Sequence, residues 1–351
     1  MILSRRPMLS RRGALGSLVS VGLATGFEPA RAAVPFTPDP ALLQAASKEG
    51  QLVLYTATLT EVAQETINVF NRRFPGVRVQ MVRASGGQLI TRIQSEAAAG
   101  KLEADVIDHS DRAQAKSIEA LFADYAPPNA DDYMPETLVS PKLWPTVTAA
   151  WCIAWNPELV NDPPKTWMDL CKPQYAGGKI GQVIGPSGGT TWTRVMFERQ
   201  VLGEDYWARQ AATQPKLFPS NAPLCDAVVR GEVAMGPLLM SIVYGKKKDG
   251  APIDMTYPPE GVPITPYGSG IARTAAHPHA ARLWMDWNLS DEGQTASIRD
   301  QGNLTSLRTP PIPVPVFDPK VDRLWTPDFT QFQTLHDTWL AEWNKAYGYR
   351  Q

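Results

Sequence analysis

The sequence of 351 residues has few of the residue types that usually build catalytic and metal centres. It contains four histidines and three cysteines, and Cys152, Cys171 and Cys225 do not have the spacing of a metal site. An odd number of cysteines leaves at least one thiol unpaired. No Gly-x-Ser-x-Gly, His-Glu-x-x-His or Cys–His arrangement is present. The sequence therefore predicts no enzyme, no bound metal and no cofactor.

The chain also lacks an apolar run long enough to cross a bilayer. Its N-terminus has a basic start, a short apolar stretch at 14–27 and the small-x-small sequence ARA at 30–32. These features predict an export signal over residues 1–32, cleaved after about Ala32, and a soluble periplasmic protein. The sequence SRRGAL at 10–15 fits a twin-arginine (Tat) signal, and an ordinary secretory signal is the alternative.

Removal of this signal changes the charge of the protein. Five arginines and one glutamate are lost, so the net charge moves from −1 to −5. A mildly acidic protein is a poor partner for nucleic acid, and none is predicted. The remaining residues, about 319 of them, exceed the usual size of one hydrophobic core, which predicts two lobes.

The first hundred residues after the signal alternate between strand and helix patterns. The runs QLVLY (51–55), VRVQMV (77–82) and ADVID (104–108) are typical of strands, and a helical pattern follows each of the first two. The resulting order βαβαβ predicts a mainly parallel sheet covered by helices, and therefore an α/β fold.

Three predicted strand ends run into helix starts that are rich in hydroxyl groups and glycine. These stretches are Thr56-Ala57-Thr58, Ser85-Gly86-Gly87 and Ser187-Gly188-Gly189-Thr190-Thr191. Unpaired N–H groups at a helix start favour an anion, and glycine lets a ligand approach the backbone closely. Each stretch could equally be a helix cap, since Thr58 with Glu61 and Ser85 with Gln88 have capping-box spacing. The third stretch lacks the Lys of a nucleotide P-loop, so it is not predicted to bind nucleotide.

The sequence DVIDHSD at 105–111 is the best candidate for an enzyme site. It places Asp108, His109 and Asp111 close together, as acid–base or metal chemistry would require. Strand alternation, however, points Asp108 and His109 to opposite faces. A strand end followed by a helix cap at Ser110 or Asp111 is the simpler interpretation.

Several segments occur in a characteristic order between residues 51 and 294. They are LVLYTATL, SGGQLITRIQSEAAAGKLEADVI, AAWCIAWNPEL, DLCKPQYAGGKIGQVIGPSGG, AVVRGEVAMG and GSGIARTAAHPHAARLWMDWNLSDEGQ. This order resembles the type II periplasmic solute-binding proteins of ABC importers (extracellular solute-binding family 1). Within them the chain is most similar to the group that includes ferric-iron, phosphonate and sugar-phosphate binders.

The resemblance implies a two-lobed periplasmic-binding-protein-like fold, with the ligand in the cleft and two crossover strands that form a hinge. By position the crossings are 149–156 and 259–268. The implied division is 33–148 plus 265–305 for lobe 1, and 149–264 plus 306–351, with the C-terminal helices, for lobe 2.

The resemblance also implies a set of ligand-binding residues. They are Thr56, Ala57, Thr58, Ser85, Gly86, Gly87, Ser110, Asp111, Ser187, Gly188, Gly189, Thr190, Thr191 and Tyr244. Hydroxyl and backbone N–H donors suit a small organic anion of the phosphate, phosphonate or carboxylate type. The expected function is that of a monomeric receptor that delivers this solute to an ABC permease in the inner membrane.

Two alternatives stay open at this point. Ferric binders of this group have two adjacent tyrosines, whereas here Val243 precedes Tyr244, which disfavours a ferric-iron carrier without excluding it. The other alternative is an exported enzyme, such as a phosphoester hydrolase, that uses Asp108 and His109.

Overall fold

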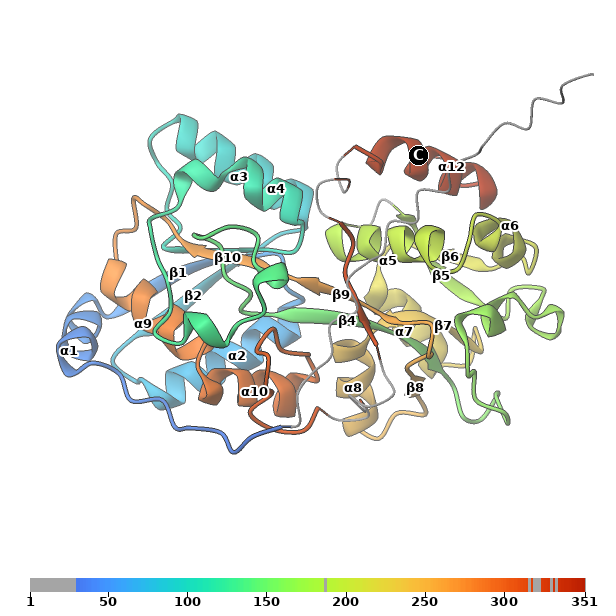
Figure 1. Ribbon diagram of the computed structural model, residues 1–351, viewed down its shortest axis with the longest axis horizontal. Helices are drawn as coiled ribbons and strands as arrows, with labels where there is room; N and C mark the ends of the chain where they lie inside the picture. The colour runs from blue at the N-terminus through green and yellow to red at the C-terminus, as the bar shows by residue number, and fades with distance from the viewer. Residues whose placement is uncertain are drawn as a thin grey trace, which may run out of the picture.

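The computed structural model describes residues 30–350, apart from 186–187, 315–316, 318–322, 329–330 and 332–333. Ser187 and nearly all of the predicted export signal lie outside the described residues. The described chain forms two α/β lobes side by side, with strands β4 and β9 running between them (Figure 1). Within the described part, no helix is both long and apolar enough to span a bilayer.

Lobe 1 contains a four-stranded sheet in the order β10-β3-β1-β2. Strands β1 (Gln51–Thr56), β2 (Arg78–Arg83) and β3 (Val106–His109) are parallel, and β10 (Gly268–Ile271) runs antiparallel to β3. Helices α2 (Thr60–Arg73) and α3 (Gly86–Ala98) connect the parallel strands. The predicted βαβαβ order is confirmed.

The two faces of this sheet follow from the alternation of side chains along β1. Leu52 and Leu54 face a core shared with α2 and α9, whereas Tyr55 faces a second core that includes Leu89 and Ile93 of α3. The remaining helices of this lobe are α1 (Pro40–Glu49), α4 (Arg112–Ser117), α9 (Pro278–Asn288) and α10 (Asp291–Gln301). Both faces are therefore covered, as a parallel sheet requires.

Lobe 2 contains a second sheet in the order β11-β9-β4-β7, with β8 beside β4, and a separate parallel pair β5-β6. The strands are β4 (Thr148–Trp155), β5 (Gly181–Val183), β6 (Lys216–Phe218), β7 (Met235–Leu239), β8 (Asp254–Thr256), β9 (Val262–Pro266) and β11 (Leu324–Trp325). The helices are α5 (Gly189–Gln200), α6 (Tyr206–Ala211), α7 (Asn221–Val229), α8 (Met240–Lys248) and α12 (His336–Ala346).

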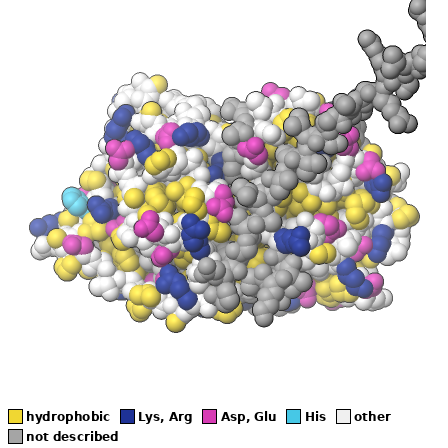
Figure 2. Space-filling model, viewed as in Figure 1, with side chains coloured by type: hydrophobic (Ala, Val, Ile, Leu, Met, Phe, Trp, Pro, Cys, Tyr) yellow, Lys and Arg dark blue, Asp and Glu magenta, His cyan; other side chains and the backbone are white. Residues whose placement is uncertain are grey.

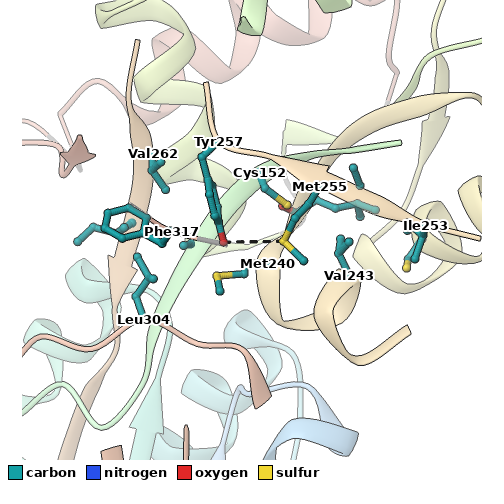
Figure 3. Packing of buried hydrophobic residues seen from close by; sticks show 14 of the residues in the cluster. Cys152, Met240, Val243, Ile253, Met255, Tyr257, Val262, Leu304 and Phe317 are labelled. Atoms are coloured by element: carbon teal, nitrogen blue, oxygen red, sulfur yellow. Dashed lines mark hydrogen bonds between the residues drawn. The ribbon is translucent and has the colours of Figure 1, made fainter. Parts of the chain in front are cut away.

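Alternation along β4 again divides the core. Cys152 packs with Met240, Met255 and their neighbours on the α7–α8 side, where the Tyr257 hydroxyl also meets the Met255 sulfur at 3.8 Å (Figure 3). Trp151, on the other face of β4, packs with the α5, α6 and α12 side chains. Short 3₁₀ turns occur at Glu119–Leu121, Ala130–Asp132, Pro135–Thr137, Trp167–Cys171 and Pro173–Tyr175.

The two lobes are joined where β4 and β9 pair in antiparallel register. Thr148 lies opposite Pro266 and Ala150 lies opposite Ile264. Beyond β9 the chain enters β10 of the lobe 1 sheet, where Ser269 forms an isolated bridge with Trp144. The two predicted crossings therefore meet as neighbouring strands in the middle of the molecule.

Three lysines lie at the end of α8. Lys246, Lys247 and Lys248 form the last turn of this helix. Cations at a helix C-terminus interact favourably with the helix dipole, which explains their place there. Strand β7 spans Met235–Leu239 and pairs with β4 along its whole length.

Candidate functional site

A cleft of about 940 Å³ opens between the lobes, on the side where α3 and α4 stand opposite α5 and α12 (Figure 1). Lobe 1 contributes Ser85, Gly86, Gly87, Gln88, Thr91, Arg92, Ser95, Asp111 and Gln114. Lobe 2 contributes Gly185, Gly188, Gly189, Trp192, His336 and Leu340. The volume lies in the range of sites that enclose a small organic ligand.

Two helices begin in this cleft without a side-chain cap. Ser85 precedes α3, but its hydroxyl donates to the Gln88 side-chain oxygen at 2.9 Å and accepts nothing from the helix backbone. Gly188 precedes α5 and has no side chain that could cap it. Among the described residues, no side chain caps the first N–H groups of either helix, and the helix dipoles favour an anionic acceptor there.

His109 holds the loops before α3 and α4 together. The Asp111 backbone N–H donates to its Nδ1 at 3.0 Å, so Nε2 carries the proton and donates to the Gly86 carbonyl at 3.0 Å. The ring is fully buried. Both ring nitrogens are occupied by these backbone contacts, so His109 positions two walls of the cleft and has no free nitrogen for proton transfer.

Asp108 lies at the centre of a buried hydroxyl cluster beside the hinge. Its carboxylate accepts hydrogen bonds from Thr56 at 2.7 Å, Thr58 at 2.8 Å and Ser269 at 2.7 Å, and Ser269 meets Thr146 at 2.5 Å. Burial raises the pKa of Asp108, and the three hydroxyl donors oppose that rise. The cluster links the loop after β1 to both crossing segments.

These contacts correct the capping box predicted at Thr58. Helix α2 begins at Thr60 with Leu59 as its N-cap residue and has no side-chain cap. The Thr58 hydroxyl donates to the Asp108 carboxylate instead. A hydrogen bond to a carboxylate is stronger than one between neutral groups, which favours this arrangement. Ser85 also makes no cap, so neither predicted capping box forms.

The two lobes touch at Gly189. A Cβ atom at this position would lie 2.6 Å from the Asp111 Cα atom and 2.8 Å from the Ser110 carbonyl oxygen. Real Cβ atoms do not come this close to a backbone, so only glycine permits the contact. Ser110 is itself buried beneath it. The last glycine of the GPSGG sequence therefore permits the close approach of the two lobes.

The hydroxyl residues that follow Gly189 are buried in α5. The Thr190 carbonyl accepts a hydrogen bond from the Trp151 indole N–H at 3.0 Å, and Thr191 is 1% exposed. Neither side chain lines the cleft. One turn further along α5, Arg194 is fully buried and forms an ion pair with Glu198. Its guanidinium group therefore lies in the lobe 2 core and not in the cleft.

Tyr244 lies away from this cleft. Its hydroxyl donates to the Arg299 carbonyl at 2.9 Å, and its ring packs on Gly302 at the end of α10. A second groove between the lobes, of about 320 Å³, runs between α2 and α8 nearby. Its lining includes Glu61, Ser241 and Lys246 but not Tyr244.

The structure thus brings together six of the predicted ligand residues in one cleft, namely Ser85, Gly86, Gly87, Asp111, Gly188 and Gly189. Thr56 and Thr58 belong to the Asp108 cluster and the half-buried Ala57 lies between them. The cleft also contains residues that sequence reasoning missed. Gln88 and Arg92 lie on the same face of α3 as Ser85, which their spacing could have indicated, whereas nothing local indicated His336.

Charge is mixed in and around the site. Basic and acidic side chains are interspersed over the described part of the face shown in Figure 2. Among the described residues, no group of three or more His, Cys, Asp and Glu side chains is placed to hold a metal ion. Cys152, Cys171 and Cys225 are free thiols, and burial raises the pKa of Cys225 to about 12.

Two α/β lobes, a polar cleft between them and two paired crossing strands define a two-lobed binding protein. Residues 51–295 match the family described as bacterial extracellular solute-binding protein, and the chain belongs to that family. It is therefore a solute-binding component of an ABC transporter.

Known relatives are distant in sequence. An uncharacterized protein of Haemophilus influenzae is 24% identical over 327 residues, which cover 85% of this chain and 92% of that protein. The periplasmic binding protein AfuA of Actinobacillus pleuropneumoniae, with fructose-6-phosphate bound, is 23% identical with a TM-score of 0.69, over 86% of this chain and 99% of AfuA. Iron-bound HitA of Pseudomonas aeruginosa is 21% identical with a TM-score of 0.68, over 84% and 99% of the two chains.

Proposed function

We propose that this protein captures a small organic anion, of the phosphate, phosphonate or carboxylate type, in the cleft between α3 and α5. The observation that carries the proposal is the convergence of two uncapped helix N-termini, from opposite lobes, on one cleft. Backbone N–H groups from both walls would hold the anion, and the lobes would close around it by motion at the β4–β9 hinge.

The location and partner follow from the family. The protein would act in the periplasm after export through its N-terminal signal, and it would pass its solute to an ABC permease in the inner membrane. Recognition of the closed form by the permease would couple binding to transport, because a ligand held by both walls of the cleft would favour that form. AfuA, with its bound sugar phosphate, is a precedent for an anionic ligand in this fold.

The exported-enzyme alternative finds little support in the geometry. Asp108 accepts three hydroxyl groups, and both nitrogens of His109 are held by backbone atoms. A ferric carrier would need phenolate ligands, and the Tyr244 hydroxyl is engaged with a backbone carbonyl. Addition of ferric salt should therefore produce no tyrosinate charge-transfer colour.

The ligand class can be tested by thermal shift against sugar phosphates, phosphonates, carboxylates and ferric salts. A ligand that binds only the folded state adds about 4 kcal/mol of stability at a thousandfold excess over its Kd. We expect phosphorylated or carboxylated compounds to raise the Tm. A response to ferric iron alone, with the charge-transfer colour, would contradict the proposal.

The Gly189 contact offers a matched pair of variants for the closure step. Gly189→Ala should hold the lobes apart, because its Cβ would meet Asp111, and an overpacked contact of this kind costs about 1–3 kcal/mol. We expect affinity for the ligand found in the screen to fall about tenfold or more. Small-angle scattering should show the variant to be more open when ligand is present.

Gly245→Ala is the control, because Gly245 lies outside this cleft and a Cβ atom there would meet open space. It lies in helix α8, where alanine is a better helix former than glycine. Its affinity should stay within about twofold of the wild type. Equal affinity of the Gly189→Ala and wild-type proteins would show that the cleft does not close at this contact.

A further inference from the structure

The C-terminal helix places one ionisable side chain in the cleft. His336 is the first residue of α12, and its ring lies edge-on to Trp192 with the ring centroids 4.8 Å apart. Its Nδ1 lies 2.9 Å from the Asp337 carboxylate, and the side chain is 40% exposed. Residue 336 lies beyond 51–295, the part of the chain that matches the family, so family resemblance assigns it no role.

Helix α12 is firmly attached to lobe 2. Trp343 is fully buried in the lobe 2 core and stacks on Tyr347, with centroids 4.3 Å apart. Glu342 forms an ion pair with Arg199 of α5 at 3.0 Å. A helix held in this way keeps His336 at a fixed place on the cleft wall, so its ring is a constant part of the site.

Few charged groups share this cleft with His336. From α3 comes Arg92, which is paired with Glu96 at 2.6 Å and lies over the Tyr55 ring. From the start of α4 comes Asp111, whose carboxylate accepts the Gln114 backbone N–H at 3.0 Å. From α12 itself comes Asp337, which points into solvent. Among the described residues that line the cleft, Arg92 and His336 are the side chains that can be cationic.

We infer that His336 contacts the anionic group of the ligand and that anion binding is thereby linked to protonation of its imidazole. The inference rests on the proposed function and adds a named side chain from lobe 2 to its backbone donors. Nδ1 is directed to Asp337, so Nε2 is the nitrogen that would donate to the ligand. An imidazolium binds an anion more tightly than a neutral imidazole does, so affinity falls as the pH rises and the imidazole loses its proton.

The linkage can be measured on the full chain with two probes, sulfate and fructose 6-phosphate. The protein has four histidines, so the imidazole proton signals can be followed by NMR, and the His336→Gln variant assigns one of them. We expect each probe to shift the His336 signal, and to shift it more at pH 5.5 than at pH 8. A charge-assisted hydrogen bond predicts that His336→Gln binds fructose 6-phosphate about tenfold more weakly at pH 5.5 and nearly as well as the wild type at pH 8.

His279→Gln is the matched control. His279, on α9, is more exposed than His336 and is paired with Glu49 of α1. It lies outside the cleft, so its replacement should leave affinity unchanged at both pH values. The comparison at each pH uses wild-type and variant proteins under the same conditions, which cancels the titration of the phosphate group itself.

The outcomes separate this inference from the proposed function. If a probe raises the Tm but leaves the His336 signal and the variant's affinity unchanged, the inference is overturned and the anion-binding function stands. If neither probe changes the Tm or any imidazole signal, both are overturned. A shift of the His336 signal by the two probes, kept in the His279→Gln variant, supports both.

Discussion

Asp108 of lobe 1 and Glu198 of lobe 2 are both buried carboxylates, but their partners differ. In lobe 1 the carboxylate of Asp108 is surrounded by hydroxyl donors from the loop after β1 and from the hinge. In lobe 2 the charges of Arg194 and Glu198 neutralise each other inside the core, and the Trp207 indole N–H donates to Glu198 at 3.0 Å. Lobe 2 is therefore left with glycine N–H groups, Trp192 and His336 at the cleft.

Because their partners differ, Glu198 and Asp108 stabilise different parts of the molecule. The Glu198 side chain fixes α5 within its own lobe and does not line the cleft. Asp108 connects Thr58, in the loop after β1, with Ser269 and Thr146, beside the two crossing strands. A change at Glu198 should therefore affect the stability of one lobe, whereas a change at Asp108 should affect both stability and the hinge.

The largest effect is expected from Arg194→Met. It leaves Glu198 buried without its cationic partner, and breaking a buried ion pair in this way costs about 3–5 kcal/mol. Burial already raises the pKa of Glu198, an effect that Arg194 opposes, so the variant should also favour the protonated carboxyl. Urea unfolding at pH 7 measures the loss.

The double variant Arg194→Met/Glu198→Leu is the control for this prediction. Replacing both charges by apolar groups of similar size removes the uncompensated carboxylate, so most of the lost stability should return. Affinity for a cleft ligand should be unchanged in the double variant, because neither side chain lines the cleft. If the double variant is as unstable as the single one, the ion pair is not the cause of the loss.

A smaller effect, with a pH dependence, is expected at Asp108. Asp108→Ala removes the acceptor of three buried hydroxyl groups and should cost about 3 kcal/mol, since some of the hydroxyls can turn to other acceptors. Unlike Arg194→Met, it should also change ligand affinity, because the hydroxyl cluster around Asp108 joins the loop after β1 to the hinge. Urea unfolding and the thermal-shift titration measure the two effects.

The raised pKa of Asp108 determines the direction in which stability changes with pH. The pKa of Asp108 is raised in the folded protein, so the folded state keeps its proton at pH values where the unfolded chain has lost it. Stability that depends on this group is therefore lost as the pH rises from about 4 through the raised pKa. Relative to the Asp108→Asn variant, the wild type should lose stability over that range.

Asp124 supplies the opposite case for comparison. Its carboxylate is exposed, and the hydrogen bond from Lys142 lowers its pKa. The wild type should therefore lose stability, relative to Asp124→Asn, as the pH falls below about 4, although the effect of an exposed pair is small. If the wild type instead lost stability relative to Asp108→Asn as the pH falls, as expected for Asp124, burial would not raise the pKa of Asp108.

The sequence predicted the fold better than it predicted the site. Periodicity located β1, β2 and β3 because a strand's pattern records which face is buried. The same hydroxyl residues could serve as caps, as ligand donors or as partners of a buried group, and sequence spacing does not distinguish these roles. Thr58 donates to Asp108 and Thr190 is buried in α5, whereas Ser85 lines the cleft.

His336 and Tyr244 show where prediction of the site reaches its limit. His336 joins the cleft through the packing of Trp343 in lobe 2, a contact across the whole chain that no local pattern records. Tyr244 was assigned to the ligand by its position in the family order, but a helix turns each successive side chain by about 100°, so a residue four places into α8 need not face the same way as its start.

The smallest effect is expected from Tyr244→Phe, which tests that assignment. The variant loses one hydrogen bond, to the Arg299 carbonyl at the end of α10, and should be destabilised by about 1 kcal/mol. Ligand affinity should stay within about twofold of the wild type, in contrast to the Gly189→Ala variant, because the phenol lines neither groove between the lobes. Calorimetric titration together with urea unfolding separates the two quantities. A tenfold loss of affinity at unchanged stability would restore Tyr244 to the ligand site and would place that site in the α2–α8 groove.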